Sequence, residues 1–445
     1  MINRASPVQT SLVIHPQSGD LDDARVAARL EEAEGLATAL DLDVADARAE
    51  PVRRIEPAAF FGSGKVEQLA SELSGSEINV LVLDTALTPV QQRNLEKALN
   101  VKVIDRTGLI LEIFGRRAQT REGRLQVELA RLTYERSRLV RTWTHLERQR
   151  GGQGFMGGPG ETQIETDRRI IADKMARLRS ELDSVRRTRR LHRSRRKAAP
   201  WPTVALVGYT NAGKSSLFNA LSEAKVLAKD MPFATLDPTT RAVRTPTGRR
   251  ILLSDTVGFI TDLPTELIAA FRATLEEVVE ADILVHVRDM ADPDHEGRKA
   301  DVEAVLEALG AGVEADQTLI EAWNKIDALG AEAREDLIWR SKLQPRPHDP
   351  HIVATSAVTG EGLADLMAVI DDALAKGDER LHVRFGPADA DARAWVHEHG
   401  SVLEEGEISE AGVTEALVRL SGPDAGRFRA RFPRLEVTLE EASAG

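Results

Sequence analysis

The stretch GYTNAGKS at residues 208–215 has the residue types and the spacing that hold the phosphates of a nucleotide. Its two glycines let the backbone curl until its N–H groups face phosphate oxygens. Lys214 brings a positive charge to the β- and γ-phosphates, and the hydroxyl of Ser215 can bind Mg²⁺. The loop consists of Gly208, Tyr209, Thr210, Asn211, Ala212, Gly213, Lys214 and Ser215. By itself this stretch predicts a nucleotide site but does not select the base.

A second motif, DTVG at residues 255–258, follows the apolar run ILLS. Asp255 can reach the same Mg²⁺ through a water molecule, and the N–H of Gly258 can contact a γ-phosphate. Thr256 and Val257 complete the turn between these two residues. The motif therefore predicts a segment that senses the third phosphate.

A third motif, NKID at residues 324–327, selects the base and follows the apolar run LIEAW. Asp327 can accept hydrogen bonds from N1–H and from the exocyclic amine of guanine, a pattern that adenine does not offer. Lys325 can lie over the plane of the base, and Asn324 can brace the phosphate loop. Ile326 lies between the two contacting residues. Together these residues predict a guanine nucleotide.

A fourth motif, TSA at residues 355–357, follows the apolar run HIVA and fits the segment whose backbone contacts O6 of guanine. Each of the four motifs stands at the end of an apolar run, and they occur in the order typical of Ras-like GTPases. An ordinary polar turn explains one of them but not all four in series. We therefore expect residues 200–375 to form a doubly wound α/β domain that hydrolyses GTP to GDP.

The segment MPFATLDPTTR between the first two motifs holds three threonines, Thr235, Thr239 and Thr240. One of them should complete the Mg²⁺ shell when GTP is bound, and ordering of this segment is the expected switch. We prefer Thr235 for this role, and the other two fit caps and turns around Pro238.

The residue after DTVG is Phe259, where many Ras-like enzymes have a glutamine that orients the attacking water. A phenyl ring cannot do this, so slow intrinsic hydrolysis is expected, with help from a partner, a nearby residue or a cation. Asn211 is a candidate K⁺ ligand at this site. The predicted catalytic residues are Lys214, Thr235, Gly258 and Asn211.

The chain of 445 residues contains no cysteine, which excludes disulfides, Cys-bound zinc and thiol catalysis and fits a reducing cytoplasm. Its N-terminus has no signal-peptide core, and no apolar run approaches the roughly 18 residues of a membrane-spanning helix. The formal net charge is −12. We expect a cytoplasmic protein that binds neither DNA nor membranes.

The charge is unevenly distributed along the chain. Residues 111–200 carry 23 Lys and Arg against 11 Asp and Glu, a net charge of +12, which leaves −24 for the remainder. A basic block in an acidic protein is typical of an element that binds a polyanion. The alternative is the solvated surface of charged helices.

Within this basic block, apolar residues recur at steps of three and four. They are Leu125, Leu129, Leu132, Leu139, Trp143 and Leu146, and then Ile164, Ile171, Met175, Leu178, Leu182 and Val185. Two such helices should pack antiparallel as a hairpin about 40 Å long. The segment GGQGFMGGPGETQ at residues 151–163 then forms its tip. Its glycines let backbone approach backbone, and Phe155 can stack on an exposed base.

Four units follow from these patterns: an N-terminal α/β domain over residues 1–110, the hairpin over 111–199, the GTPase domain, and an α+β domain over 376–445. Alternation of the strands SLVIHP, INVLVLD and VKVID with helices predicts a largely parallel sheet in the first unit. GSGK in this unit lacks the first glycine of a phosphate loop, and we interpret it as a tight turn before a helix.

Several stretches resemble the HflX family of ribosome-associated GTPases: FGSGKVEQL, QQRNLEKAL, VIDRTGLILEIFGRRAQTREGRLQVELARL, GGPGETQIETDRR and GYTNAGKSSLFNAL. The likeness covers roughly residues 10–375. It implies an N-terminal α/β domain, a helical hairpin, a GTPase domain and a small C-terminal domain. It also implies binding to the large (50S) ribosomal subunit and the splitting of stalled ribosomes, notably after stress.

The resemblance assigns roles to individual residues. It makes Ser215 and Thr235 ligands of Mg²⁺, and Asp255 a ligand through water. The switch segment comprises Phe233, Ala234, Thr235, Leu236 and Asp237, and the guanine site adds Ser356, Ala357 and Val358 to the NKID motif. The residues that approach rRNA near the peptidyl-transferase centre are Gly154, Phe155, Met156, Gly157 and Gly158.

Two other functions fit the same residues: a GTPase factor in large-subunit assembly, and an RNA-binding scaffold whose conformation the nucleotide controls. In each case GTP and GDP, Mg²⁺ and the large subunit are the expected partners, K⁺ is a candidate cofactor, and we expect a monomer off the ribosome.

Overall fold

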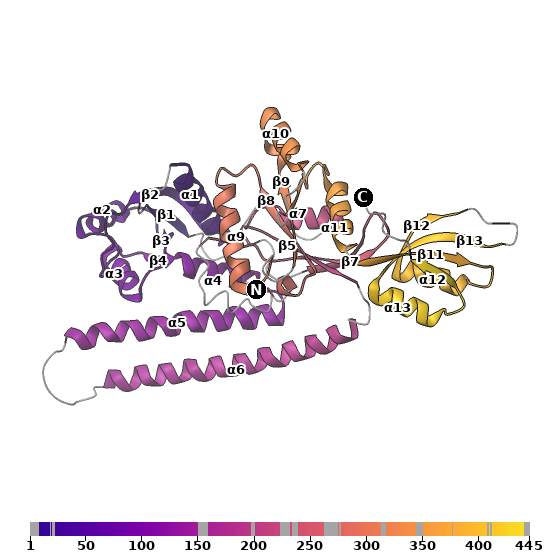
Figure 1. Ribbon diagram of the computed structural model, residues 1–445. Helices are drawn as coiled ribbons and strands as arrows, with labels where there is room; N and C mark the ends of the chain where they lie inside the picture. The colour runs from indigo at the N-terminus through magenta and orange to yellow at the C-terminus, as the bar shows by residue number, and fades with distance from the viewer. Residues whose placement is uncertain are drawn as a thin grey trace, which may run out of the picture.

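The computed structural model describes the chain except for residues 1–8, 18, 20–22, 150–158, 197–200, 223–231, 234–238, 262–274, 276, 313–316, 344–349, 376, 407–408, 410–411 and 440–445. It shows three sheet-containing domains in a row, with a long helical arm along one side (Figure 1). The expected mixed α/β, multidomain architecture is confirmed. Among the described helices, none combines the length and apolar character needed to cross a bilayer.

The N-terminal domain is built on a parallel sheet of order β2-β1-β3-β4. Its elements are β1 (Thr10–Gln17), α1 (Asp23–Thr38), β2 (Asp43–Pro51), α2 (Ser63–Leu73), β3 (Val80–Leu83), α3 (Pro89–Leu99) and β4 (Lys102–Asp105). The strand β2 was not predicted, because it is an edge strand with one buried residue, Glu50, and too few apolar side chains to signal a strand. Lys65 of the GSGK stretch lies in α2 and pairs with Glu50 at 2.6 Å, which supports the turn-and-helix interpretation.

The arm consists of α5 (Arg121–Gln149) and α6 (Pro159–Arg196), which run side by side in Figure 1. At its base the two helices share a small apolar cluster, made of Leu125, Leu129, Leu132, Ile171, Met175 and Leu178. Antiparallel packing on the three-and-four spacing is therefore present where side chains are described. The predicted tip contacts, residues 154–158, lie outside the described residues.

The arm is rooted in the N-terminal domain through α4 (Arg106–Arg117), which runs across position 110, where the sequence placed a domain boundary. Asp105, at the end of β4, caps α4 by accepting from the N–H of Gly108 at 2.8 Å. The same carboxylate accepts from Tyr134 at 2.5 Å and from Arg138 at 2.6 Å, both on α5. One buried carboxylate therefore fixes the direction in which the arm leaves the domain.

The GTPase domain contains a six-stranded sheet of order β10-β9-β8-β5-β7-β6, with β6 antiparallel to β7 and the other pairs parallel. Its strands are β5 (Thr203–Val207), β6 (Thr239–Arg244), β7 (Arg250–Asp255), β8 (Ile283–Asp289), β9 (Thr318–Asn324) and β10 (His351–Ala354). Its described helices are α7 (Lys214–Ser222), α9 (His295–Leu309), η2 (Ile326–Ala328), α10 (Ala331–Ser341) and α11 (Leu363–Leu374). The apolar runs ILLS, LIEAW and HIVA form the parallel strands β7, β9 and β10. The edge strand β6 is mostly exposed and was missed.

The C-terminal domain is an antiparallel sheet of order β12-β13-β11-β14. Its elements are β11 (Asp378–Phe385), α12 (Ala390–His399), β12 (Gly400–Glu405), β13 (Thr414–Ser421), α13 (Gly422–Arg431) and β14 (Glu436–Leu439). Trp395 and Phe428 pack at 5.4 Å between ring centroids in its core. The α+β class was predicted, although β12 and α13 were not.

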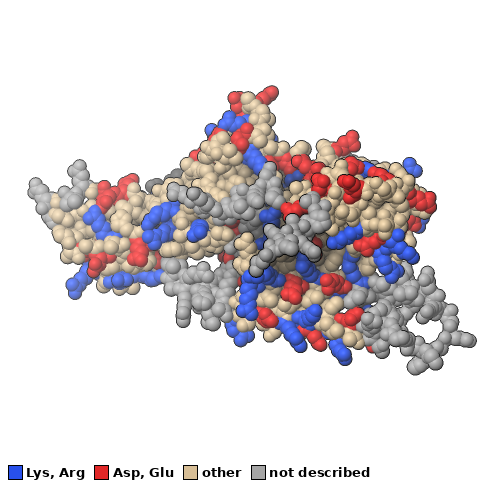
Figure 2. Space-filling view, turned by 180° about the vertical axis from the view of Figure 1, so that it is seen from behind, with Lys and Arg blue, Asp and Glu red and all other residues tan. Residues whose placement is uncertain are grey.

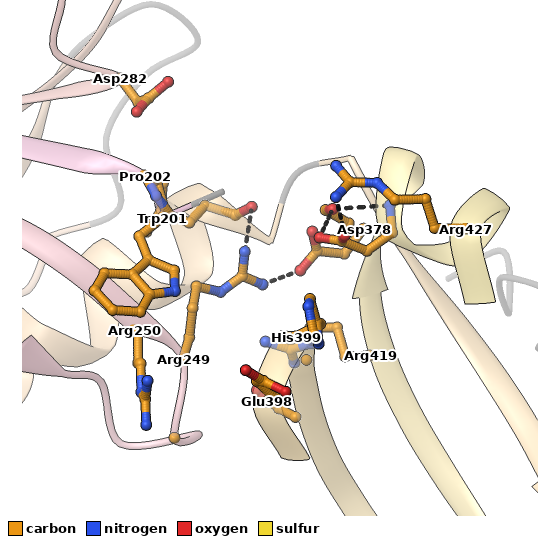
Figure 3. A pocket seen from close by; sticks show the side chains of 16 residues that line it. Trp201, Pro202, Arg249, Arg250, Asp282, Asp378, Glu398, His399, Arg419 and Arg427 are labelled. Atoms are coloured by element: carbon orange, nitrogen blue, oxygen red, sulfur yellow. Dashed lines mark hydrogen bonds and ion pairs between the residues drawn. The ribbon is translucent and has the colours of Figure 1, made fainter. Parts of the chain in front are cut away.

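A cavity of about 430 Å³ lies between the GTPase and C-terminal domains (Figure 3). Arg249 reaches across it from the β6–β7 turn and donates to Asp378 of β11. Its Nε also lies 3.6 Å from the buried carboxylate of Asp371 in α11. The cavity borders the first residue of β7, Arg250, whereas Asp255 ends that strand, so the cavity is separate from the nucleotide motifs.

Candidate functional site

The four predicted motifs converge at one edge of the six-stranded sheet. The phosphate loop follows β5, DTVG begins at the last residue of β7, NKID begins at the last residue of β9, and TSA follows β10. All four strands are parallel, so their carboxyl ends meet at the same edge. This edge is where open α/β sheets bind their ligands.

The phosphate loop depends on two glycines and one asparagine in the left-handed region. Gly208 has φ +149° and Gly213 has φ +92°, and Asn211 adopts φ +62° at an exposed position of the loop. A Cβ on Gly208 would collide with the carbonyl oxygen of Val287 in β8. The last two residues of the loop, Lys214 and Ser215, begin α7, and the positive end of this helix dipole therefore lies at the site.

Lys214 is buried, and its ammonium group donates to the carbonyl oxygens of Gly208 at 3.1 Å and Tyr209 at 2.6 Å. Burial lowers the pKa of Lys214 to about 8, while the charge of Asp255 acts in the opposite direction. A buried lysine that lies on its own loop can exchange these carbonyl contacts for phosphate oxygens.

Two of the three residues expected to hold Mg²⁺, Ser215 and Asp255, lie together. The hydroxyl of Ser215 donates to the carboxylate of Asp255 at 2.7 Å, and Asp255 is fully buried. Hydroxyl and carboxylate oxygens are the ligands that Mg²⁺ prefers, so this pair fits the ion. Thr239 and Thr240 belong to β6, whereas Thr235 lies outside the described residues. No group of three or more His, Cys, Asp or Glu with metal-binding geometry occurs among the described residues.

The guanine motifs are tied to the phosphate loop and to each other. Asn324 donates from Nδ2 to the carbonyl of Ala212 at 2.9 Å and accepts from the N–H of Ala357 at 3.2 Å. The predicted bracing role of Asn324 therefore has a direct geometric basis. Ser356 donates to Asp327 at 2.5 Å, which holds that carboxylate in one orientation.

Other residues of the predicted nucleotide site divide between the surface and the core. Lys325 has φ +64° and pairs with Asp289 of β8 at 2.8 Å. Val358 is 81% exposed, whereas the side chain of Ile326 is fully buried in a small core beside β9 and α10. Thr256 is also buried and donates to the carbonyl of Leu206 at 2.6 Å, so its side chain supports the motif rather than the nucleotide.

Two phenylalanines near the motifs belong to the core. Phe259 is 1% exposed, and its backbone pairs with the phosphate loop through Gly208 at 3.1 Å and Thr210 at 2.7 Å. Phe233 is buried against Phe114 of α4, with ring centroids 4.5 Å apart. The sequence grouped Phe233 with the nucleotide contacts, but its ring packs on the N-terminal domain. Ala234, Thr235, Leu236 and Asp237 lie outside the described residues.

The sequence did not reveal a buried network beside the site that joins Tyr209 and Thr261 to Glu32 and Arg106. The first pair lies in the GTPase domain, and the second lies in the N-terminal domain. These residues are far apart along the chain and belong to no shared motif, so no local pattern marks them.

Gly213→Ala should weaken GTP binding by about tenfold or more, because the new methyl group would both strain a positive φ and collide with Asn324 Nδ2. The collision breaks the bond between Asn324 and Ala212 as well. Gly310→Ala is the matched control, since Gly310 has φ +67° with open space around it, and should leave GTP affinity unchanged. Titration of both variants with GTP measures the two affinities. An equal loss of GTP affinity in both variants would refute the predicted role of Gly213.

Three family models match the chain. The model described as GTP-binding GTPase N-terminal matches residues 27–115, GTP-binding GTPase Middle Region matches residues 117–196, and 50S ribosome-binding GTPase matches residues 203–325. The three matched ranges follow one another along the N-terminal domain, the arm and the GTPase domain.

Curated relatives extend the match over most of the chain. GTPase HflX of Magnetococcus marinus is 49% identical over 411 residues, which are 92% of this chain and 92% of that protein. GTPase HflX of Escherichia coli is 41% identical over 416 residues, 90% of this chain and 94% of that protein. GTPase HflX of Lacrimispora saccharolytica is 40% identical over 402 residues, 90% of this chain and 91% of that protein. The chain therefore belongs to the HflX family of GTPases.

Proposed function

We propose that this protein binds GTP with Mg²⁺ and hydrolyses it to GDP at the edge of the six-stranded sheet. The observation that carries the proposal is the bonding between motifs: Asn324 joins the phosphate loop to the TSA segment, and Ser215 joins that loop to Asp255. Separate structural turns would not need these links. Membership of a GTPase family supports the same conclusion.

Each residue of the site has a proposed role in binding or hydrolysis. Lys214 and the loop N–H groups hold the phosphates, and Asp327 accepts from guanine. Mg²⁺, held by Ser215 and through water by Asp255, would neutralise charge that develops on the phosphates. Thr235 is proposed to complete that shell, and the N–H of Gly258 to contact the γ-phosphate.

Asn211 is proposed to bind K⁺, which would supply the positive charge that an arginine finger supplies in other GTPases. Turnover should then be about tenfold faster in K⁺ than in Na⁺ at equal ionic strength, because a cation at the phosphates stabilises the transition state. Asn211→Ala should remove the difference between the two salts without abolishing turnover. Equal rates for the unaltered protein in both salts would contradict the proposal.

We propose that the partner is the large ribosomal subunit, reached by the arm. One matching family model is described as a 50S ribosome-binding GTPase, and α6 alone spans 38 residues, or about 57 Å of helix. Lys and Arg lie among acidic residues on the described surface of the arm (Figure 2). Arginines that bind rRNA phosphates make the affinity fall with salt. The protein is expected to act in the cytoplasm, as a monomer off the ribosome.

The proposed outcome of this binding is the splitting of stalled ribosomes, notably after stress. Sucrose gradients of stalled 70S particles with the protein and GTP should show free subunits, and a deletion strain should retain stalled particles after heat. Accumulation of immature large subunits in that strain would instead favour an assembly factor. Full ribosome action by Lys214→Ala would favour an RNA-binding scaffold.

A further inference from the structure

The strand β8 ends between the two halves of the proposed nucleotide site. In the sheet order β10-β9-β8-β5, the guanine motifs follow β9 and β10, and the phosphate loop follows β5. A nucleotide that reaches from the guanine motifs to the phosphate loop therefore has to pass the end of β8. The last residue of this strand is Asp289, whose register partner on β9 is Asn324, the first residue of NKID. Asp289 thus stands beside the path of the nucleoside.

The carboxylate of Asp289 is held in place by the backbone. Its Oδ1 accepts from the N–H of Ala291 at 3.0 Å, which closes a turn directly after the strand. The N–H of Met290 donates to the carbonyl oxygen of Asn324 at 3.0 Å and so ties this turn to the start of NKID. The other carboxylate oxygen, Oδ2, is therefore presented at the sheet edge by a turn that is bonded to β9.

This oxygen binds the lysine of NKID. Nζ of Lys325 lies 2.8 Å from Oδ2 of Asp289, although the two residues belong to different strand ends. The backbone of Lys325 adopts φ +64°, a conformation that is unfavourable for a residue with a Cβ and has to be stabilised by its surroundings. The carbon stem of Lys325 runs from the end of β9 to the end of β8. It therefore extends along the edge from the guanine motifs toward the phosphate loop.

The ion pair is not needed to hold the two strands together. β8 and β9 are already paired over seven residues, from Ile283 with Thr318 to Asp289 with Asn324. The side chains of Lys325 and Asp289 are 30% and 16% exposed, and ion pairs that water reaches add little to the free energy of unfolding. What the pair does fix is the direction of the one lysine that the sequence places over the base.

A lysine that covers a base has to be extended when the base arrives. A free lysine side chain has several rotatable bonds, and ordering them on binding lowers the affinity. Asp289 orders Lys325 before the nucleotide binds, because the ammonium group is already held at the far end of the stem. The methylene groups can then offer an apolar surface to the base while the charge stays paired.

We propose that Asp289 is a positioning residue for the guanine base, which holds the side chain of Lys325 extended along the sheet edge before a nucleotide binds. The inference rests on the proposed GTP site and on the expected place of Lys325 over the base. It adds a residue outside the four motifs to those that set the affinity. Asp289 raises the affinities for GTP and GDP by the same factor, because the two nucleotides share their base and differ only in their phosphates.

Asp289→Asn removes the charge that holds Lys325 and keeps an oxygen that can accept from Ala291. Calorimetric titration of the full-length variant should show affinities for GDP and for a non-hydrolysable GTP analogue that are both about three- to tenfold below those of the unaltered protein. Lys325→Met keeps an unbranched apolar stem without the ammonium group, and should cause a loss at least as large. Asp336→Asn is the matched control, since Asp336 also pairs with a basic residue, Arg340 of α10, and should change neither affinity.

The variant with both substitutions separates positioning from structural damage. If Asp289 acts through Lys325, adding Asp289→Asn to Lys325→Met should change neither affinity by more than about twofold. A further three- to tenfold loss in that background, a loss confined to one of the two nucleotides, or no loss in Asp289→Asn alone would overturn the proposal. Absence of any nucleotide binding by the unaltered protein would instead refute the proposed GTP site, so the two failures are distinguishable.

Discussion

Asp327→Asn should change the nucleotide that the protein prefers from GTP to xanthosine triphosphate. Guanine presents two donors to Asp327, N1–H and the amine at C2, whereas xanthine carries a carbonyl at C2. An asparagine amide can accept from N1–H and donate to that carbonyl, but it opposes the guanine amine with an NH₂ group. A site built for one hydrogen-bond pattern discriminates by about 10⁴-fold, so GTP affinity should fall by roughly this factor.

The hydrogen bond that Asp327 makes within the protein can also be made by an asparagine. Ser356 donates to its Oδ1 at 2.5 Å, and an asparagine keeps one oxygen that can accept this bond. Competition binding with GTP and xanthosine triphosphate measures the change. Asp336→Asn, at an exposed side chain on α10, loses the same charge outside the site and should retain GTP. Retention of GTP by Asp327→Asn, without gain of xanthosine triphosphate, would contradict the assignment of the base site.

Replacement of residues 154–158 with a Gly-Ser turn of equal length should leave GTP binding intact and abolish ribosome splitting. The helices α5 and α6 supply the reach of the arm, and Asp105 fixes its direction, so the replacement changes only what is presented at the end. Dissociation of 70S particles, followed by light scattering, measures the loss. Phe155→Ala separates base stacking from the turn itself, and stacking accounts for about 1–3 kcal/mol per base.

Splitting at the normal rate by the replaced tip would show that this segment is only a turn. Loss of GTP binding by the same variant would show that the arm and the nucleotide site are not separable. The replacement therefore tests both the reach of the arm and the independence of the site.

The nucleotide site was predictable because its residues occur at short, fixed spacings along the chain. Lys214, Ser215, Asp255, Asn324 and Asp327 each stand at a fixed distance from the end of an apolar strand, and parallel strands bring those ends together. The arm was predictable for a similar reason, since the three-and-four spacing of apolar residues implies a helix and a partner.

The features that were missed depend on contacts rather than on spacing. The edge strands β2 and β6 are polar, because only one side of such a strand pairs with a neighbour and much of it faces solvent. The place of Phe233 in the switch stays a prediction, and what the sequence did not reveal is that its ring packs on Phe114, more than a hundred residues earlier. The bond between Tyr209 and Glu32 joins residues 177 positions apart, a separation at which sequence patterns carry no information.

One measurement tests most directly whether the ribosome acts on the GTPase site. GTP turnover should be measured with and without purified 50S subunits, with Lys214→Ala as the control for contaminating activity. Phe259 cannot orient water, so a slow basal rate is expected, with stimulation by 50S subunits on the order of tenfold or more. Turnover that stays unchanged when 50S subunits are added would contradict the proposal that this GTPase works on the large ribosomal subunit.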